Sequence, residues 1–263
     1  MKNTLIILMF TLVVSTSCAS IQQRNLDKVV FIHGANFTAK SWKPLIDKVD
    51  DVEHISINLP GRMDSVSHKD IDLDMSSQAL CEYLEQIDGK LSLVAHSQAG
   101  AIVNHSLTMC PSIDIKKIIY ISAVVPLDGE KVFAKLNKED DKQYFSGIEY
   151  DKVSSSLNII DDEKFIKSFV GETNAKNKEL ILSSAVSEPS QIGEGVVKMD
   201  ATRFNSIPKY YIKTLKDKII SLESQKNIIS GINFKKVFSI DSTHLPMITH
   251  SEELALIFQE ILE

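Results

Sequence analysis

The sequence has little of what marks several large classes of protein. Three Cys among 263 residues are too few for a disulfide scaffold, and 10 Gly with 7 Pro exclude a collagen-like or low-complexity chain. There is no basic excess, since 29 Lys and Arg face 35 Asp and Glu, so nucleic acid is not an expected partner. The hydrophobic content of 43% is that of a globular domain that buries a core.

The N-terminus carries an apolar run of ten residues, Leu5–Val14, which follows Lys2 and precedes small residues. At about 1.5 Å per residue such a run is too short to cross a membrane core of roughly 30 Å. The pattern is typical of a secretory signal over residues 1–17, and the alternative is a buried first strand or helix. We therefore expect a protein exported from a bacterial cytoplasm.

Cys18 follows this run directly after a small residue and resembles the lipobox of a bacterial lipoprotein. The resemblance implies that lipidated Cys18 is the first mature residue, that 18–27 is a short tether, and that a membrane surface is a partner. Ser15 stands where an aliphatic residue is usual, so plain secretion, to the periplasm or beyond, is the alternative. Cys81 and Cys110 are expected as buried thiols, although export also permits a disulfide between them.

The rest of the chain, residues 28–263, alternates short apolar runs with helical patterns and forms one domain. The runs end at turn signals and predict strands over 29–32, 52–59, 91–95, 117–125, 210–215 and 234–240. Helices are predicted over 42–49, 76–87 and 98–109 and from Ser251, which is its expected cap. This alternation predicts an α/β fold with an open, mostly parallel sheet of about six strands and helices on both faces. The charged, helical pattern of residues of about 130–205 breaks the rhythm and predicts a lid insertion.

Ser97 is the candidate nucleophile, because it follows the most apolar strand and precedes a helix that begins with small residues. This is the context of the nucleophile elbow Gly-x-Ser-x-Gly, in which small neighbours fit a strained turn. Here Ala95 and Ala99 stand where Gly is usual. The alternative interpretation of Ser97 is an ordinary helix cap.

A serine hydroxyl needs a base, and the base needs a carboxylate to orient it. In this fold the chain order is Ser, acid, His, and reactive groups gather where strands end. His244 follows the last predicted strand, and Asp217 follows the one before it. Asp128 and Asp241 are alternative acids, although Asp241 lies only three residues before His244.

The oxyanion of a tetrahedral intermediate needs backbone N–H donors. Gln98, directly after the candidate nucleophile, and Ala35, in the loop after the first strand, are the expected donors. His33 is expected to orient that loop rather than to act as a second base. Cys and His show no ligand-like spacing, so neither a metal nor an organic cofactor is expected.

Four segments, 29–42, 93–100, 211–225 and 242–254, resemble the α/β-hydrolase superfamily, and most of all the plant methyl esterase and hydroxynitrile lyase family with its bacterial esterase relatives. The resemblance implies the α/β-hydrolase fold, Ser97 as nucleophile, Asp217 as acid, His244 as base, and a small ester as substrate. The lyases have a Thr and a Lys where this chain has Gly34 and Leu245, which favours a serine carboxylesterase. Hydroxynitrile lyase, acyl transfer and a non-catalytic binder of small ligands are the alternatives.

Overall fold

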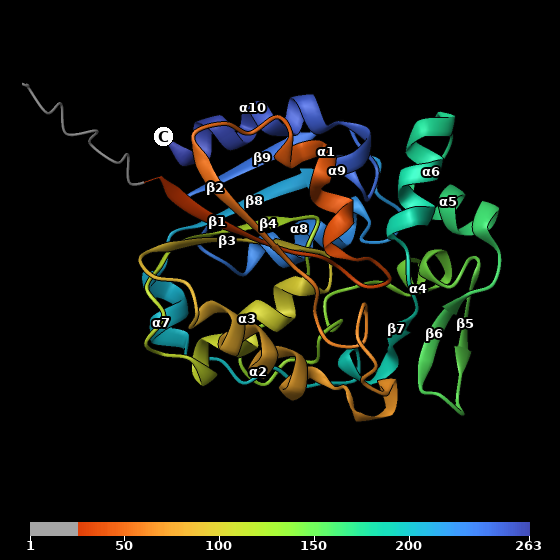
Figure 1. Cartoon of the computed structure of the whole chain (residues 1–263), viewed down its shortest axis with the longest axis horizontal. Helices are drawn as coiled ribbons and strands as arrows, with labels where there is room; N and C mark the ends of the chain where they lie inside the picture. The colour runs from red at the N-terminus through yellow and green to blue at the C-terminus, as the bar shows by residue number, and fades with distance from the viewer. Residues whose placement is uncertain (1–25) are drawn as a thin grey trace, which may run out of the picture.

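A computed structural model describes residues 26–263 and has a six-stranded parallel sheet at its centre (Figure 1). The strand order is β2-β1-β3-β4-β8-β9. The strands are β1 (Asp27–Ile32), β2 (Val52–Ile57), β3 (Leu91–His96), β4 (Ile115–Ile121), β8 (Lys209–Thr214) and β9 (Lys236–Ile240). The predicted sheet is thereby confirmed. Strand β4 ends four residues earlier than predicted, because Ser122 takes a left-handed φ of 44° that leaves the extended conformation.

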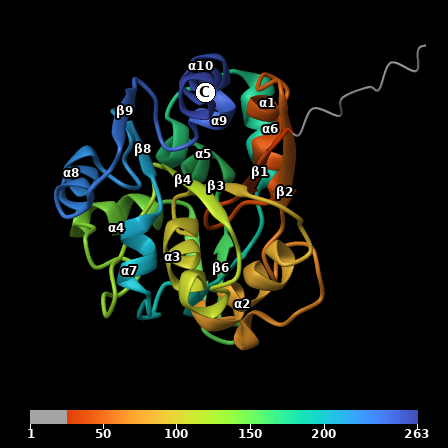
Figure 2. The same ribbon diagram turned by 90° about the vertical axis from the view of Figure 1, so that its left-hand side faces the viewer.

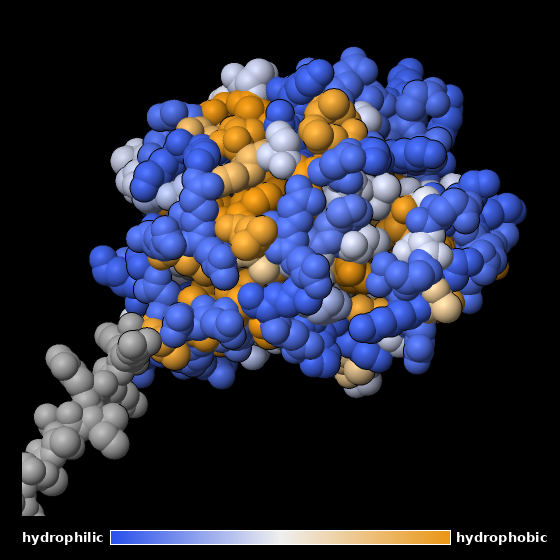
Figure 3. Space-filling model, turned by 90° about the horizontal axis from the view of Figure 1, so that it is seen from above, coloured by the Kyte–Doolittle hydropathy of each residue, from blue (hydrophilic) through white to orange (hydrophobic). Residues whose placement is uncertain are grey.

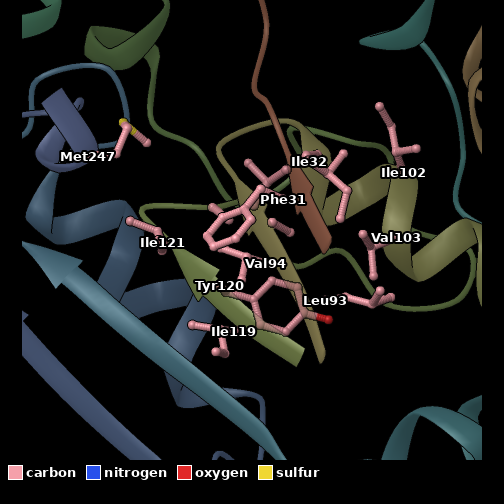
Figure 4. Packing of buried hydrophobic residues seen from close by; sticks show 14 of the residues in the cluster. Phe31, Ile32, Leu93, Val94, Ile102, Val103, Ile119, Tyr120, Ile121 and Met247 are labelled. Atoms are coloured by element: carbon pink, nitrogen blue, oxygen red, sulfur yellow. The ribbon is translucent and has the colours of Figure 1, made fainter. Parts of the chain in front are cut away.

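The central strands are apolar on both faces because helices cover both faces of the sheet. Every residue of β3 is buried, and its neighbours β1 and β4 are buried toward their carboxyl ends. The core close-up shows Phe31, Val94 and Tyr120 from these three strands packed side by side (Figure 4). Burial of this kind fixes the register, so the carboxyl ends of the strands have fixed relative positions.

Helices α2 (Leu73–Leu84) and α3 (Ala99–Met109) pack on one face of the sheet, and α1 (Lys43–Ile46), α9 (Pro246–Thr249) and α10 (Ser251–Leu262) lie over the other (Figures 1 and 2). Helix α8 (Leu222–Ser230) follows β8. Seen over α10, the surface is hydrophilic around scattered apolar areas (Figure 3). Helices on both faces were predicted, and this is confirmed.

Some predicted helix bounds are wrong, for local reasons. Residues 42–49 form a 3-10 turn, η1 (Ala39–Trp42), and the single-turn α1, rather than one helix. Helix α2 begins three residues earlier than predicted, because the Asp72 side chain accepts a hydrogen bond from the Met75 N–H and caps it. Ser251 is the first residue of α10 and not its cap, since the N-cap position belongs to His250.

Most of the segment between β4 and β8 lies at the carboxyl end of the sheet, while its last helix, over residues 201–206, lies at the opposite end beside the end of α3 (Figure 1). It contains α4 (Lys138–Tyr144), β5 (Ile148–Asp151), β6 (Ser156–Ile159), α5 (Asp162–Val170), α6 (Ala175–Ser184), β7 (Glu188–Pro189), η3 (Ser190–Ile192) and α7 (Ala201–Ser206). Strands β5, β6 and β7 form a small antiparallel sheet that the purely helical prediction missed. Its strands have two to four residues, which is too short for a periodic pattern.

Cys81 on α2 and Cys110, directly after α3, form a disulfide with a Cα–Cα distance of 5.6 Å. The expectation of two thiols is therefore wrong, although both residues are buried as predicted. Packing of α2 against α3 brings the two cysteines together. The predicted signal and Cys18 lie outside the described residues. Between residues 26 and 263, no helix is long and apolar enough to cross a membrane.

Candidate active site

Three polar side chains meet at the carboxyl edge of the sheet, each directly after a different strand. Ser97 follows β3, Asp217 lies in the loop after β8, and His244 lies in the loop after β9. The Ser97 hydroxyl is 3.0 Å from His244 Nε2, and His244 Nδ1 is 2.8 Å from Asp217 Oδ2. All three residues are buried, so the series of hydrogen bonds is shielded from bulk water.

Ser97 stands on a sharp turn between β3 and α3. Its φ is 55°, in the left-handed region that L-residues rarely adopt. The turn is tied to the end of β4, because the Ser97 N–H donates to the Ile121 carbonyl at 3.3 Å and the Ser97 carbonyl accepts from the Val124 N–H at 3.1 Å. Gly100 is required, since a Cβ there would stand 2.0 Å from the Val124 carbonyl oxygen.

Ala95 and Ala99 depart from the usual glycines of the elbow, and the structure shows that this turn accommodates them. Both side chains are fully buried in the core. Neither residue has a positive φ, so neither position needs the conformational freedom of glycine. The residue that must be small for close packing against Ser97 is Gly34, because a Cβ there would lie 2.7 Å from the Ser97 Cβ.

His244 is held from several sides. Its backbone N–H donates to the Phe169 carbonyl at 3.1 Å, and its carbonyl accepts from His96 Nε2 at 2.8 Å. The Phe169 ring meets the imidazole edge-on, with centroids 5.5 Å apart. Burial, with the nearby His244, holds the pKa of His96 well below its usual value, so His96 stays neutral and acts as a fixed donor.

The carboxylate of Asp217 is fully hydrogen-bonded. Oδ1 accepts from the backbone N–H groups of Ile219 and Ile220, at 2.8 and 3.1 Å. Oδ2 accepts from the hydroxyls of Thr214 and Ser122 in addition to the imidazole. Burial by itself would raise the pKa of Asp217, but the imidazole and the hydrogen bonds outweigh it and hold the pKa below its usual value. Asp217 is therefore an anion that fixes the orientation of the imidazole.

The two alternative acids lie elsewhere. Asp128 accepts a hydrogen bond from the Met199 N–H at 2.9 Å. Asp241 forms an exposed ion pair with Lys216 at 2.7 Å. Within residues 26–263, Asp217 is the carboxylate that His244 contacts.

The two expected oxyanion donors line one cavity together with Ser97. Neither the Ala35 N–H nor the Gln98 N–H donates a hydrogen bond to any described residue, so both are free to bind a ligand. The cavity measures about 670 Å³. Most of its remaining wall comes from the segment between β4 and β8. An anionic oxygen on a carbon bonded to Ser97 would find two unused donors here.

A buried network from that segment holds the loop that carries Ala35. Asn36 has a φ of 61°, and its N–H donates to Glu188 Oε2 at 3.1 Å. Its side-chain amide donates to two carbonyls of the segment and accepts from the Tyr144 hydroxyl at 2.6 Å. Glu188 also forms an ion pair with Arg62 at 2.6 Å, and both side chains are 0% exposed.

His33 orients the same loop from the side of the sheet. Its Nε2 accepts from the Leu59 N–H at 3.0 Å, and its Nδ1 donates to the Gly34 carbonyl at 2.9 Å. Burial, with the nearby Arg62, lowers the pKa of His33 to about 3. The neutral ring is therefore fully used in these two bonds and is not free to act as a base. In the described chain, no group of His, Cys, Asp and Glu is arranged to hold a metal ion.

Sequence reasoning missed several residues that shape this site. Ser122 interrupts an otherwise apolar strand pattern, and that single polar residue was a usable signal. Asn36 and Arg62 gave none, because their contacts with Glu188 join positions 152 and 126 residues apart.

The sequence and the fold both match those of known proteins. The model of the alpha/beta hydrolase family matches residues 29–255. Methylesterase 7 of Arabidopsis thaliana is 23% identical, over 92% of this chain and 98% of its own length.

Two solved structures share the fold. A pyrethroid hydrolase from Sphingobium faniae superposes with a TM-score of 0.76 at 17% identity, over 90% of this chain and 97% of that one. A methylesterase from Arabidopsis superposes with a TM-score of 0.76 at 19% identity, over 90% and 99%. The resemblance predicted from the sequence is confirmed, and this chain belongs to the alpha/beta hydrolase family.

Proposed function

We propose that the protein is a serine carboxylesterase that acts on small esters. One observation carries the proposal: Ser97, His244 and Asp217 form an unbroken series of hydrogen bonds beside two free N–H groups in a cavity of about 670 Å³. A non-catalytic binder would have no need for this series. Leu245, which replaces the lysine of the lyases, favours hydrolysis over cyanide release.

In the proposed reaction, the Ser97 oxygen attacks the ester carbonyl while its proton passes to His244 Nε2. The carbonyl oxygen becomes an anion and accepts hydrogen bonds from the N–H groups of Ala35 and Gln98. His244 then donates its proton to the leaving alkoxide oxygen, and the alcohol departs from an acyl-enzyme. Water, deprotonated by His244, attacks the acyl carbon and releases the carboxylic acid and the free Ser97 hydroxyl.

The relatives support ester hydrolysis at the level of the reaction class, since methylesterases and pyrethroid hydrolases both have names that denote ester cleavage or hydrolysis. Their identities of 17 to 23% leave the substrate of this chain open. Acyl transfer to an alcohol would use the same acyl-enzyme, and it differs only in the acceptor that enters the cavity.

The test is hydrolysis of p-nitrophenyl acetate and butyrate by the wild type and by Ser97→Ala, with Ser183→Ala on the exposed side of α6 as the matched control. We expect Ser97→Ala to lose at least about a thousandfold in kcat/KM, and the control to keep full activity. A fluorophosphonate probe should label Ser97. Equal rates in wild type and Ser97→Ala would overturn the assignment.

We also propose that the enzyme is exported and tethered through lipidated Cys18. The Cys81–Cys110 disulfide supports an oxidising compartment, because such bonds are rare in a reducing cytosol. Expression of the full chain in a bacterium fed labelled palmitate should label the wild type and not Cys18→Ser. A chain that keeps residues 1–17 in the cytoplasm would contradict both export and tethering.

A further inference from the structure

The cavity above Ser97 has an acidic wall. Three carboxylates line it, those of Asp140, Asp141 and Glu194, against one basic side chain, Lys131. Asp140 and Asp141 are consecutive residues of α4, in the segment between β4 and β8. The wall therefore presents more negative charge than the rest of the lining, which is mainly apolar.

Asp140 is the unusual member of this wall. It is 1% exposed, and its Oδ2 atom is buried without a hydrogen-bond partner in residues 26–263. On the same helix, Lys142 pairs with Glu139. A buried carboxylate without a partner is costly, and such a group in a cavity wall is suited to bind a donor that arrives with a ligand.

Asp141 also favours the binding of a positively charged group at this wall. Partial burial, together with the charge of Asp140, raises the pKa of the Asp141 carboxyl above its usual value. The two carboxylates therefore repel each other. A cation bound at this wall would relieve that repulsion.

A second unused acceptor lies beside the nucleophile. The side chain of Gln98 lines the cavity and is 3% exposed, and its Oε1 atom is buried without a partner in the described chain. Four aromatic side chains also line the cavity, those of Phe133, Tyr144, Phe145 and Tyr150. Aromatic faces attract cations, and they pack well against the alkyl groups of an amine.

We propose that the natural substrates are esters that carry a protonated amine, with the ammonium group bound by Asp140 and Asp141 while the ester carbonyl lies on Ser97. This inference rests on the proposed esterase function, since it names the substrate class of the same site. The carboxylates touch no reacting atom, and they act by binding and orienting the substrate.

The experiment compares matched thioesters that differ in one group. S-2-(dimethylamino)ethyl thiobutyrate carries the amine, S-3-methylbutyl thiobutyrate is its neutral isostere, and S-2-hydroxyethyl thiobutyrate offers a neutral donor. Homologues with three and four methylenes cover other distances from Ser97. We expect the wild type to prefer the best amine ester over its isostere by about 10- to 100-fold in kcat/KM.

Variants locate the effect on α4. Asp140→Asn should reduce the preference to about threefold or less. Glu149→Gln removes an equal charge from an exposed position of β5 outside the cavity and should leave the preference unchanged. Asp141→Asn, at a more exposed position, should reduce the preference in part, and it serves if Asp140→Asn does not fold.

The outcomes separate the two proposals. If the isostere or the hydroxyl ester is hydrolysed as fast as the amine ester, the amine proposal is wrong while the esterase remains. If the preference persists in Asp140→Asn and Asp141→Asn, the carboxylates do not cause it, and the proposal is wrong. If no ester of any kind is cleaved and the fluorophosphonate probe does not label Ser97, the proposed function itself fails.

Discussion

The cavity is built by two regions that follow different rules. The sheet places Ser97, Asp217 and His244 at the ends of buried parallel strands, where packing on both faces fixes each position. The segment between β4 and β8 supplies most of the cavity wall from short helices and strands with many charged residues. The arrangement that the proposed chemistry needs is thus held by the most regular part of the fold, whereas the least regular part lines the cavity.

Hydrogen bonds nevertheless join the two regions beside the site. Backbone hydrogen bonds join residues 36–38 to residues 184–186, and Glu188 of β7 binds the Asn36 N–H. The loop of the expected oxyanion donor Ala35 is therefore clamped by the segment as well as by His33. The following predictions test how far the two regions can be separated, from the largest expected effect to the smallest.

Asp217, which follows strand β8 of the sheet, should be the acid that orients His244. We expect Asp217→Asn to lower kcat about a thousandfold or more, because an amide favours the wrong tautomer of His244 and no longer stabilises its cation. Asp128→Asn and Asp241→Asn are the matched controls, and both should stay within about twofold of the wild type in steady-state assays. A large loss in either control would transfer the role to that residue.

Breaking the clamp between the regions should cost both stability and activity. Glu188→Gln leaves the buried Arg62 guanidinium without its partner, which we expect to lower the free energy of unfolding by about 3–5 kcal/mol. Asn36 also loses a charged acceptor. We therefore expect a lower kcat, with little change in KM, at temperatures below the melting transition. Glu179→Gln, an exposed change on α6, is the control for urea unfolding and kinetics. An unchanged kcat in folded Glu188→Gln would mean that the segment only covers the site.

The disulfide should stabilise the sheet region without touching the cavity. It closes a loop over a sequence separation of 29, for which chain entropy suggests a loss of about 3.6 kcal/mol when Cys81→Ser and Cys110→Ser are combined. Urea unfolding of the double variant measures this loss. Its kcat/KM at low temperature should equal that of the wild type, and a change in substrate preference would contradict the separation.

We expect buried neutral histidines to make the free energy of unfolding decrease at acid pH. The unfolded chain binds a proton at His33 near pH 6.5, whereas the folded chain does so only near pH 3. Between these values the unfolded state holds more protons, so stability falls as the pH falls, by about 1 kcal/mol per pH unit. His33→Gln should show a correspondingly smaller slope in urea unfolding at several pH values. Parallel curves for variant and wild type would show that His33 does not contribute.

The positions of Ser97, Asp217 and His244 could be predicted from the sequence because parallel strands end at one edge, so residues far apart in the chain share one place. The existence of the strands followed from apolar runs that end at turn signals. The order Ser, acid, His followed from the fold that those strands predict. The small antiparallel sheet, the Arg62–Glu188 pair and the disulfide depend on how distant segments pack, and no local pattern encodes them. Asp140 gave no signal either, since its charge run is that of an ordinary solvated helix face.

Ser97, Asn36 and Ser122 are three of the five non-glycine residues with a left-handed backbone in the described chain, and all three belong to the site. Each left-handed L-residue is strained by about 1 kcal/mol or more. Ser97→Gly would relieve that strain while it removes the hydroxyl, so an inactive protein should melt at a higher temperature than the active one. If Ser97 is the nucleophile, as proposed, selection for heat resistance alone would favour its loss, and selection for turnover would keep serine at position 97.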